Sequence, residues 1–269
     1  MDSAASEKSI IALDRWLQTP AGLYVRAWEQ QCLDRLTADI FGFNALQIGM
    51  PQLNALAANR MPNQWIADSR TPQVLTPSPA GATVPVMGGA RTSVVLAFDE
   101  LPFASQSLDL VVLPHVLEFA AEPHQVLREV ERVLMPEGQL IICGFNPASL
   151  WGARQLTGRM GGTPYLPLAG EFISMPRVKD WLKLLNMGVN HSHHGCYAPA
   201  CRTDKWLRRY GFMDRAGARW WPYFGAVYMV QAIKRVKGMR LIGPAWKKSP
   251  ATAPAALPVT NKRREQQDG

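Results

Sequence analysis

The chain has 269 residues, of which 47% are hydrophobic, and it is long enough to bury a sizeable core. Its four cysteines are too few and too scattered for a disulfide scaffold, and no apolar run approaches the roughly 20 residues that a membrane-spanning helix needs. The first ten residues lack the basic segment and apolar stretch of a secretory signal, so we expect a cytoplasmic protein.

Positive charge is concentrated in the C-terminal half. The net charge is +8, and residues 177–246 hold 13 Lys/Arg against 3 Asp/Glu, whereas residues 1–176 hold 11 against 16. Such an asymmetry suits an anionic partner, namely nucleic acid, an acidic small molecule or anionic lipid headgroups. It also suits a solvated basic face that binds nothing. The oligomeric state is left open.

The N-terminal region is predicted to be helical. Residues 10–40 read as two helical pieces, and Thr19-Pro20 marks a helix start, because a threonine hydroxyl caps a first turn and proline suits its first position. Apolar residues recur at helical spacing from Leu23 onward, with Tyr24 and Trp28 beside them.

The stretch from residue 94 to 147 has the most consistent local pattern. Residues 108–113 form an apolar run that predicts a strand buried on both faces. Pro123 fits the first turn of a helix, and Pro136 and Gly138 are expected to end it before a second strand at residues 139–143. The apolar positions of that helix are Val126, Leu127, Val130, Val133 and Leu134. A unit of this length predicts parallel strands joined by a right-handed crossover, which is typical of an α/β fold.

Two further helices are predicted downstream. Asn146 is expected to cap a helix that begins at Pro147 and ends near Gly158 or Gly161, and residues 172–185 form the next helix. The histidines and cysteines of residues 191–201 lack the paired spacing of a zinc motif, so we expect no metal site.

The segment from residue 206 to 224 alternates arginines with aromatic residues. This mixture suits base stacking with phosphate contacts, docking at a membrane interface, or core packing of Trp220, Trp221 and Phe224 beneath exposed arginines. The sequence does not choose among them.

The central run DELPFASQSLDLVVLPHVLEFAAEPHQVLREVERVLMPEGQLII resembles the class I S-adenosylmethionine-dependent methyltransferases, most closely the type 11 group. The runs FISMPRVKDWLKLLNMGV and FGAVYMVQAIKR are similar to that family's last helix and closing antiparallel strand. The resemblance covers roughly residues 42–236. It implies a Rossmann-like, mostly parallel seven-stranded sheet flanked by helices.

The resemblance also implies how the chain is divided. Residues 1–41 would form a helical cover, residues 42–238 the methyltransferase domain with a substrate-side insertion at 146–170, and residues 239–269 a basic, disordered tail. The family's first three strands would fall at residues 45–48, 64–67 and 94–97, with a glycine-rich loop and a helix after the first.

The resemblance implies that S-adenosylmethionine is the cofactor. Gly49 falls at the tight turn after the first strand, although Met50 and Pro51 stand where the family repeats glycines. Asp68 lies 19 positions later, where an acidic residue accepts hydrogen bonds from ribose hydroxyls. The remaining positions that would contact the cofactor are Phe98, Asp99, Pro114 and His115.

The sequence signals for the residues that would contact the methyl acceptor are less specific than those for the cofactor. His115 is the candidate general base, because imidazole titrates near neutral pH, and it could equally position the cofactor or cap a helix. The residues that would line the substrate region are Tyr24, Trp28, Asn146, Trp151 and Arg154, and core packing is the alternative role for Tyr24 and Trp28.

The resemblance therefore predicts methyl transfer to an oxygen or nitrogen of an unidentified small-molecule or anionic acceptor. The rival hypothesis, favoured by Met50-Pro51, is a non-catalytic module of the same fold that binds nucleic acid or another anionic partner through its basic C-terminal face.

Overall fold

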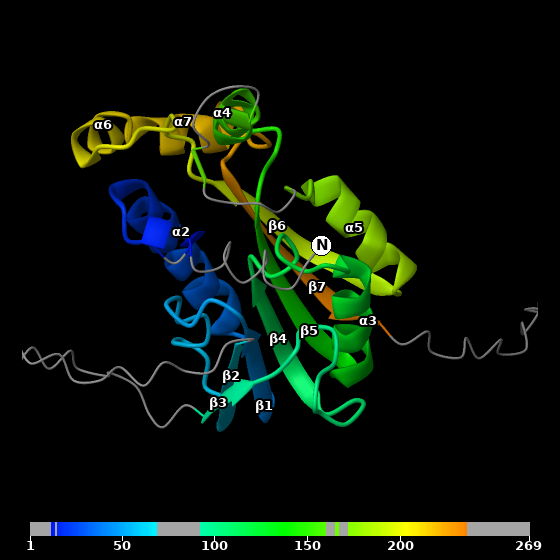
Figure 1. The fold of residues 1–269 in the computed structure, drawn as a ribbon. Helices are drawn as coiled ribbons and strands as arrows, with labels where there is room; N and C mark the ends of the chain where they lie inside the picture. Colours follow the sequence, from blue (N-terminus) through cyan, green and yellow to red (C-terminus); the bar gives the residue numbers. More distant parts are fainter. Residues whose placement is uncertain (1–11, 14, 69–91, 160–164, 167–171, 236–269) are drawn as a thin grey trace, which may run out of the picture. The chain divides into compact units, whose positions relative to one another are not determined.

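A computed structural model describes residues 12–13, 15–68, 92–159, 165–166 and 172–235 (Figure 1). All of them belong to one unit, Met1–Val236, in which the N-terminal helical region and the predicted methyltransferase domain are joined. Residues 69–91 and the tail expected at 239–269 lie outside the described residues. No helix in the described ranges is long and apolar enough to cross a membrane.

A seven-stranded sheet runs through this unit in the order β3-β2-β1-β4-β5-β7-β6. Strands β1 to β5 are parallel, and β7 is antiparallel to both of its neighbours, which confirms the predicted architecture. Its strands are β1 (Asn44–Ile48), β2 (Asn63–Asp68), β3 (Thr92–Val95), β4 (Leu108–Pro114), β5 (Leu134–Phe145), β6 (Met187–Gly195) and β7 (Val227–Lys234). Strand order reverses between β1 and β4, and open α/β sheets bind ligands beyond the carboxyl ends of the strands at such a point.

Side chains alternate along the central strands and supply two separate cores. Leu110 and Val112 of β4 join the core that contains α2 (Pro20–Thr37), whereas Val111 and Leu113 join the core that contains α3 (Pro123–Val133) and α5 (Met175–Leu184). Figure 1 accordingly shows α2 on one side of the sheet and α3 with α5 on the other. The remaining helices are α4 (Leu150–Arg159), α6 (Asp204–Arg209) and α7 (Phe212–Trp220).

The predicted crossover is confirmed, with one change at its end. The helix stops at Val133 and β5 begins at the next residue, so Pro136 and Gly138 lie inside the strand. Leu108 pairs with Leu134 but Leu110 pairs with Gln139, and residues 135–138 therefore form an irregularity in β5. A proline cannot donate to a ladder, and such a bulge accommodates it.

Three other boundaries differ from prediction. β3 starts two residues earlier than expected, and turns replace the helix expected after β1. α4 begins at Leu150 rather than Pro147, because the Oγ atom of Ser149 accepts a hydrogen bond from the Gly152 amide. Asn146 bonds elsewhere as well, since its Nδ2 atom donates to the carbonyl oxygens of Tyr223 and Gly225.

Candidate functional site

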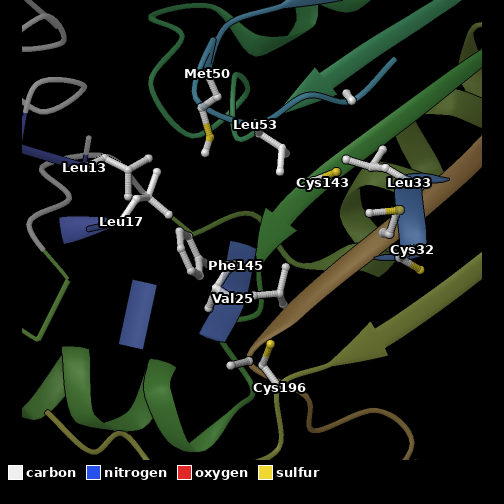
Figure 2. Close-up of a cluster of buried hydrophobic side chains, with 14 of the residues drawn as sticks. Leu13, Leu17, Val25, Cys32, Leu33, Met50, Leu53, Cys143, Phe145 and Cys196 are labelled. Carbon is white, nitrogen blue, oxygen red and sulfur yellow. The ribbon is translucent and has the colours of Figure 1, made fainter. Parts of the chain in front are cut away.

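The turn after β1 is the first part of the candidate site. Gly49 and Met50 both have left-handed backbones, with φ of +77° and +45°. A Cβ atom on Gly49 would lie 3.0 Å from Cγ2 of Val116, so glycine permits both the conformation and the close approach of the loop after β4. Figure 2 shows the Met50 side chain in the core with Leu13 and Leu17, where it is 4% exposed.

The side chain of Gln47 fixes this turn from within. Its Nε2 atom donates to the carbonyl oxygens of Gly49, Met50 and Leu53 at 2.8 to 3.1 Å, and its Oε1 atom accepts from the Ala55 amide at 3.0 Å. Gln47 is fully buried. A buried amide with both ends paired stabilises a turn that has lost the usual glycines and its following helix.

Helix α2 holds the same turn from the other side. A guanidinium nitrogen of Arg26 donates to the Gln52 carbonyl at 2.8 Å. The side-chain amide of Gln30 donates to the Asn54 carbonyl at 2.8 Å and accepts from the Asn54 amide at 3.2 Å. The predicted N-terminal cover is thus bonded directly to the candidate cofactor turn.

The positions expected to contact the cofactor gather at this edge. The Gly49 amide donates to the Ala67 carbonyl, next to Asp68, and the Leu96 amide donates to the Asp68 carbonyl. From the site of a Gly49 Cβ atom, Cζ of Phe98 and the carbonyl oxygen of Pro114 each lie at 3.9 Å. Asp99 follows in an exposed turn.

His115 is placed differently from its neighbours. Its side chain is buried, with Nε2 2.6 Å from a carboxylate oxygen of Glu29 on α2 and Nδ1 2.9 Å from Glu118. The other Glu118 oxygen accepts the Phe145 amide at the end of β5. His115 itself has a left-handed backbone, with φ of +54°. This ionic cluster, Glu29–His115–Glu118, ties α2, the loop after β4 and the end of β5 together.

The carboxylates decide the charge of the imidazole. Burial lowers the pKa of His115, but the charges of Glu29 and Glu118 outweigh it and raise the pKa to about 10. Burial also raises the pKa of the Glu118 carboxyl, against the opposing effect of the imidazolium. With both ring nitrogens engaged and the proton held, the geometry favours positioning over general-base chemistry among the roles expected for His115.

Glu29 and Gln47 were not singled out from the sequence. Glu29 is buried completely on the apolar stripe of α2, four residues from Val25 and from Leu33, and its Oε2 atom has no hydrogen-bond partner among the described residues. A carboxylate at core spacing on an amphipathic helix is the signal that could have identified it. Gln47 carries a similar signal, as a polar residue inside an otherwise apolar strand.

The substrate candidates lie around the segment that follows β6. The Tyr24 hydroxyl donates to Asp214 of α7, and the ring of Trp28 packs so closely on Gly195 that a Cβ there would clash with it. Trp151 is buried, and its indole N–H donates to the Ala198 carbonyl at 2.7 Å.

The last of these candidates, Arg154, lies on α4, and the start of that helix borders a pocket. Arg154 donates to the Ala200 carbonyl and lies over the Tyr165 ring, 4.7 Å from its centroid. The pocket has a volume of about 500 Å³ and is lined by the start of α4 and by Phe172. Within the described ranges no cluster of three or more His, Cys, Asp or Glu side chains could hold a metal ion.

The chain is similar in sequence to a family model and to a protein of Escherichia coli. Residues 79–142 match the family model of a methyltransferase domain of type 11. Over 238 residues the chain is 32% identical to the uncharacterized protein YafS of Escherichia coli K12, covering 87% of this chain and 86% of YafS. The chain belongs to the class I methyltransferase family. Its place is in the type 11 group, as the resemblance of the central run had indicated.

Two further similar proteins share less of the sequence. Malonyl-[acyl-carrier protein] O-methyltransferase of Laribacter hongkongensis is 27% identical over 158 residues, which is 59% of this chain and 50% of that protein. A SAM-dependent methyltransferase of Thermotoga maritima has the same fold with a TM-score of 0.56 and 13% identity, covering 82% of this chain and 94% of that one.

The cofactor of this family is S-adenosylmethionine, and the residues present fit it. Gly49 leaves the space that a Cβ would fill, at the edge where Asp68 and Phe98 also lie. The fit comes from fewer backbone N–H groups than a glycine-rich loop supplies, because the Gly49 amide donates to the Ala67 carbonyl and Pro51 has no N–H.

Proposed function

We propose that this protein transfers a methyl group from S-adenosylmethionine to an oxygen or nitrogen atom of a small or anionic acceptor. The observation that carries the proposal is the convergence of Gly49, Asp68 and Phe98 at the strand-order reversal of a class I methyltransferase sheet. Family membership supports methyl transfer in general, and the acceptor is the part that this proposal leaves to experiment.

Each residue has a defined task in this proposal. The backbone of the Gly49 turn lies close to the cofactor. The Asp68 carboxylate accepts hydrogen bonds from the ribose hydroxyls. The Phe98 ring stacks on the adenine, and Asp99 lies at the edge of the adenine. Once bound, the cofactor supplies a methyl carbon that its positive sulfur makes electrophilic. The Pro114–His115 turn forms the wall of the site nearest β4.

The protein's contribution to the rate is then mainly orientation and exclusion of water. The ionic cluster fixes the loop after β4 against α2, and the buried aromatic residues Trp151 and Phe145 close the adjoining core. The acceptor is proposed to enter beside α4, at the pocket lined by residues 147–149, the first turns of α4 and Phe172. Asn146 and Arg154 bond this region to the connection between β6 and β7.

A second candidate function is a non-catalytic binding module of the same fold. It is favoured by one observation, namely that the Gly49 amide already donates to the Ala67 carbonyl and Pro51 has no N–H, so the turn offers fewer backbone donors than a glycine-rich loop. Cofactor titration separates the two functions, because a module that has given up catalysis has no need to bind the methyl donor.

The decisive measurement is calorimetric titration of the full chain with S-adenosylmethionine and with its demethylated product. We expect saturable heats with both ligands, and Asp68→Ala to weaken each affinity about tenfold or more through lost charged hydrogen bonds. Asp68→Asn, which keeps the shape, should weaken binding less.

The matched control is Asp39→Ala, which removes an exposed carboxylate between α2 and β1 at the opposite edge of the sheet. It should leave both affinities unchanged. No heat from the native chain at millimolar ligand would overturn the proposal, and equal affinities of Asp68→Ala and the native chain would reject the ribose role of Asp68.

A further inference from the structure

The connection between β6 and β7, which we call the excursion, lies at the ligand-binding edge of the sheet and contains two helices. Gly195 pairs with Val227, so residues 196–226, with α6 and α7, lie at the end where β5 also finishes. Asn146 and Arg154 bond to carbonyl oxygens within this excursion. Figure 1 shows α7 next to α4 in this view, with α6 farther from α4 than α7 is.

This excursion exposes an unusual number of large aromatic side chains. Their exposed fractions run from 47% to 73%, which rules out the core packing expected as one option for Trp220, Trp221 and Phe224. We call the set the aromatic face, and it consists of Trp206, Phe212, Trp220, Trp221, Tyr223 and Phe224. Exposed apolar side chains concentrated in this way mark an interaction site.

The aromatic face is not needed to hold the excursion in place. α7 buries only Gly217, whose Cβ would lie 2.3 Å from the Tyr197 ring, and α6 buries only Leu207. Asp214 adds two anchors, because it accepts the Tyr24 hydroxyl and the Tyr197 amide. Trp206 stacks on Tyr210 and Tyr223 packs edge-on to His194, and the exposed parts of the six side chains remain accessible to another partner.

The charge of the same segment is strongly positive. Residues 202–224 contain six Lys/Arg and two Asp. Asp214 is turned inward to Tyr24, and Asp204 pairs with Arg208 at 2.7 Å. All six basic residues are exposed, so an anionic surface would meet them around the aromatic rings.

We propose that the aromatic face docks on an anionic lipid bilayer. Four of its six aromatic residues fall within residues 220–224, and such a cluster, in a segment with six exposed basic residues, suits insertion at the headgroup boundary. Stacking on a single nucleic acid strand calls instead for rings spaced along the path of successive bases. The tryptophan and tyrosine side chains also combine apolar bodies with polar tips, as bilayer interfaces favour.

This docking would place the carboxyl edge of the sheet, and the pocket beside α4, next to the lipid. It goes beyond methyl transfer and does not depend on it, because lipid binding is measured without cofactor. If both proposals hold, the acceptor is to be sought among molecules present at a membrane surface.

The test is co-sedimentation of the full chain with lipid vesicles at low salt. Vesicles of phosphatidylcholine alone are compared with vesicles containing about one third phosphatidylglycerol, and we expect binding to the anionic vesicles at least about tenfold tighter. The double variant Trp220→Ala/Trp221→Ala and the double variant Arg215→Gln/Arg219→Gln should each weaken that binding about tenfold.

The control is Phe41→Ala/Phe43→Ala. These two phenylalanines are 78% and 71% exposed, but they precede β1 at the opposite edge, so vesicle binding should not change. Circular dichroism and melting confirm that each variant is folded. The proposal is overturned by absence of vesicle binding, by equal loss in the control, by binding that ignores the tryptophans, or by tighter binding to a single-stranded RNA oligonucleotide than to the vesicles.

Discussion

Two turns face each other across the strand-order reversal, and they are stabilised by opposite means. The turn after β1 is held by the neutral amide of Gln47, which satisfies four backbone groups. The turn after β4 is held by the charged cluster of Glu29, His115 and Glu118. Both turns contain a residue other than glycine with a left-handed backbone, Met50 in one and His115 in the other.

The two turns differ in whether the groups that hold them titrate. Both ends of the Gln47 amide are paired and an amide does not titrate, whereas the ionic cluster consists of three titratable side chains. In the described part of the chain each turn also has buried oxygens without a hydrogen-bond partner, namely Oε1 of Gln52 and Oδ1 of Asn54 in one and Oε2 of Glu29 in the other. Buried strain and unpaired polar atoms are commoner at functional sites than elsewhere.

Replacing the imidazole should break the charged turn most severely. His115→Leu leaves two carboxylates buried without their counter-charge, and we expect a loss of about 3–5 kcal/mol in the free energy of unfolding. Denaturation in urea measures it. His124→Leu on α3, where the histidine is exposed, is the control and should cost little. A loss below about 1 kcal/mol in His115→Leu would contradict the charged cluster.

Replacing the amide of the other turn should cost somewhat less. Gln47→Leu leaves the Ala55 amide and the carbonyl oxygens of Gly49 and Leu53 without their partner, while the Met50 carbonyl keeps the Leu53 amide, for an expected loss of about 2–4 kcal/mol. The same denaturation applies, with Gln125→Leu at an exposed position of α3 as control. Equal free energies of unfolding for Gln47→Leu and Gln125→Leu would show that the Gln47 side chain does not stabilise the turn.

A pH series distinguishes the two turns directly. The pKa of His115 is raised from 6.5 to about 10, so its stabilisation is complete below pH 6.5 and is lost as pH rises toward 10. The raised pKa of Glu118 acts in the same direction. Unfolding free energy should therefore fall between about pH 6.5 and pH 8, below the ordinary range of the buried thiols.

The control for the pH series is Glu29→Gln, which removes one of the two carboxylates that hold the proton. Its unfolding free energy should depend less steeply on pH over the same interval, whereas Gln47→Leu should keep the native slope. A native chain with a flat profile would show that the imidazole is neutral in the folded protein.

The smallest effect is expected from restoring a glycine to the neutral turn. Pro51→Gly returns a backbone N–H and should tighten binding of S-adenosylmethionine a few-fold. It should also lower the free energy of unfolding by up to about 1 kcal/mol, because glycine raises the conformational entropy of the unfolded chain. Titration and melting measure the two effects. Pro222→Gly, in the excursion, is the matched control and should leave cofactor affinity unchanged.

The sequence predicted the parts of the fold that depend on local pattern. The crossover from β4 through α3 to β5 was predicted because apolar periodicity and the flanking prolines act within a few residues. The helix after β1 was wrongly expected from the family, since the bonds of Gln47 and of α2 to residues 49–55 replace it with turns. Those bonds join residues far apart in the chain, and spacing does not reveal them.

The candidate site was predicted to a similar degree. Gly49, Asp68, Phe98 and Pro114 were placed by strand ends, which follow from the fold. The partners of His115 were not, because Glu29 precedes it by 86 residues and only packing of α2 brings them together. The roles of these residues stay predictions until cofactor binding is measured.

The double attachment of α2 has a mechanical consequence. Tyr24 donates a hydrogen bond to Asp214 of α7. Glu29 lies five residues farther along the same helix, about 7.5 Å away, and its carboxylate accepts a hydrogen bond from the imidazolium of His115. A rigid rod fastened at both points transmits displacement from one to the other. A displacement of α7 would therefore be transmitted through α2 to the turn after β4. A ligand bound at that turn would in the same way shift the orientation of α7.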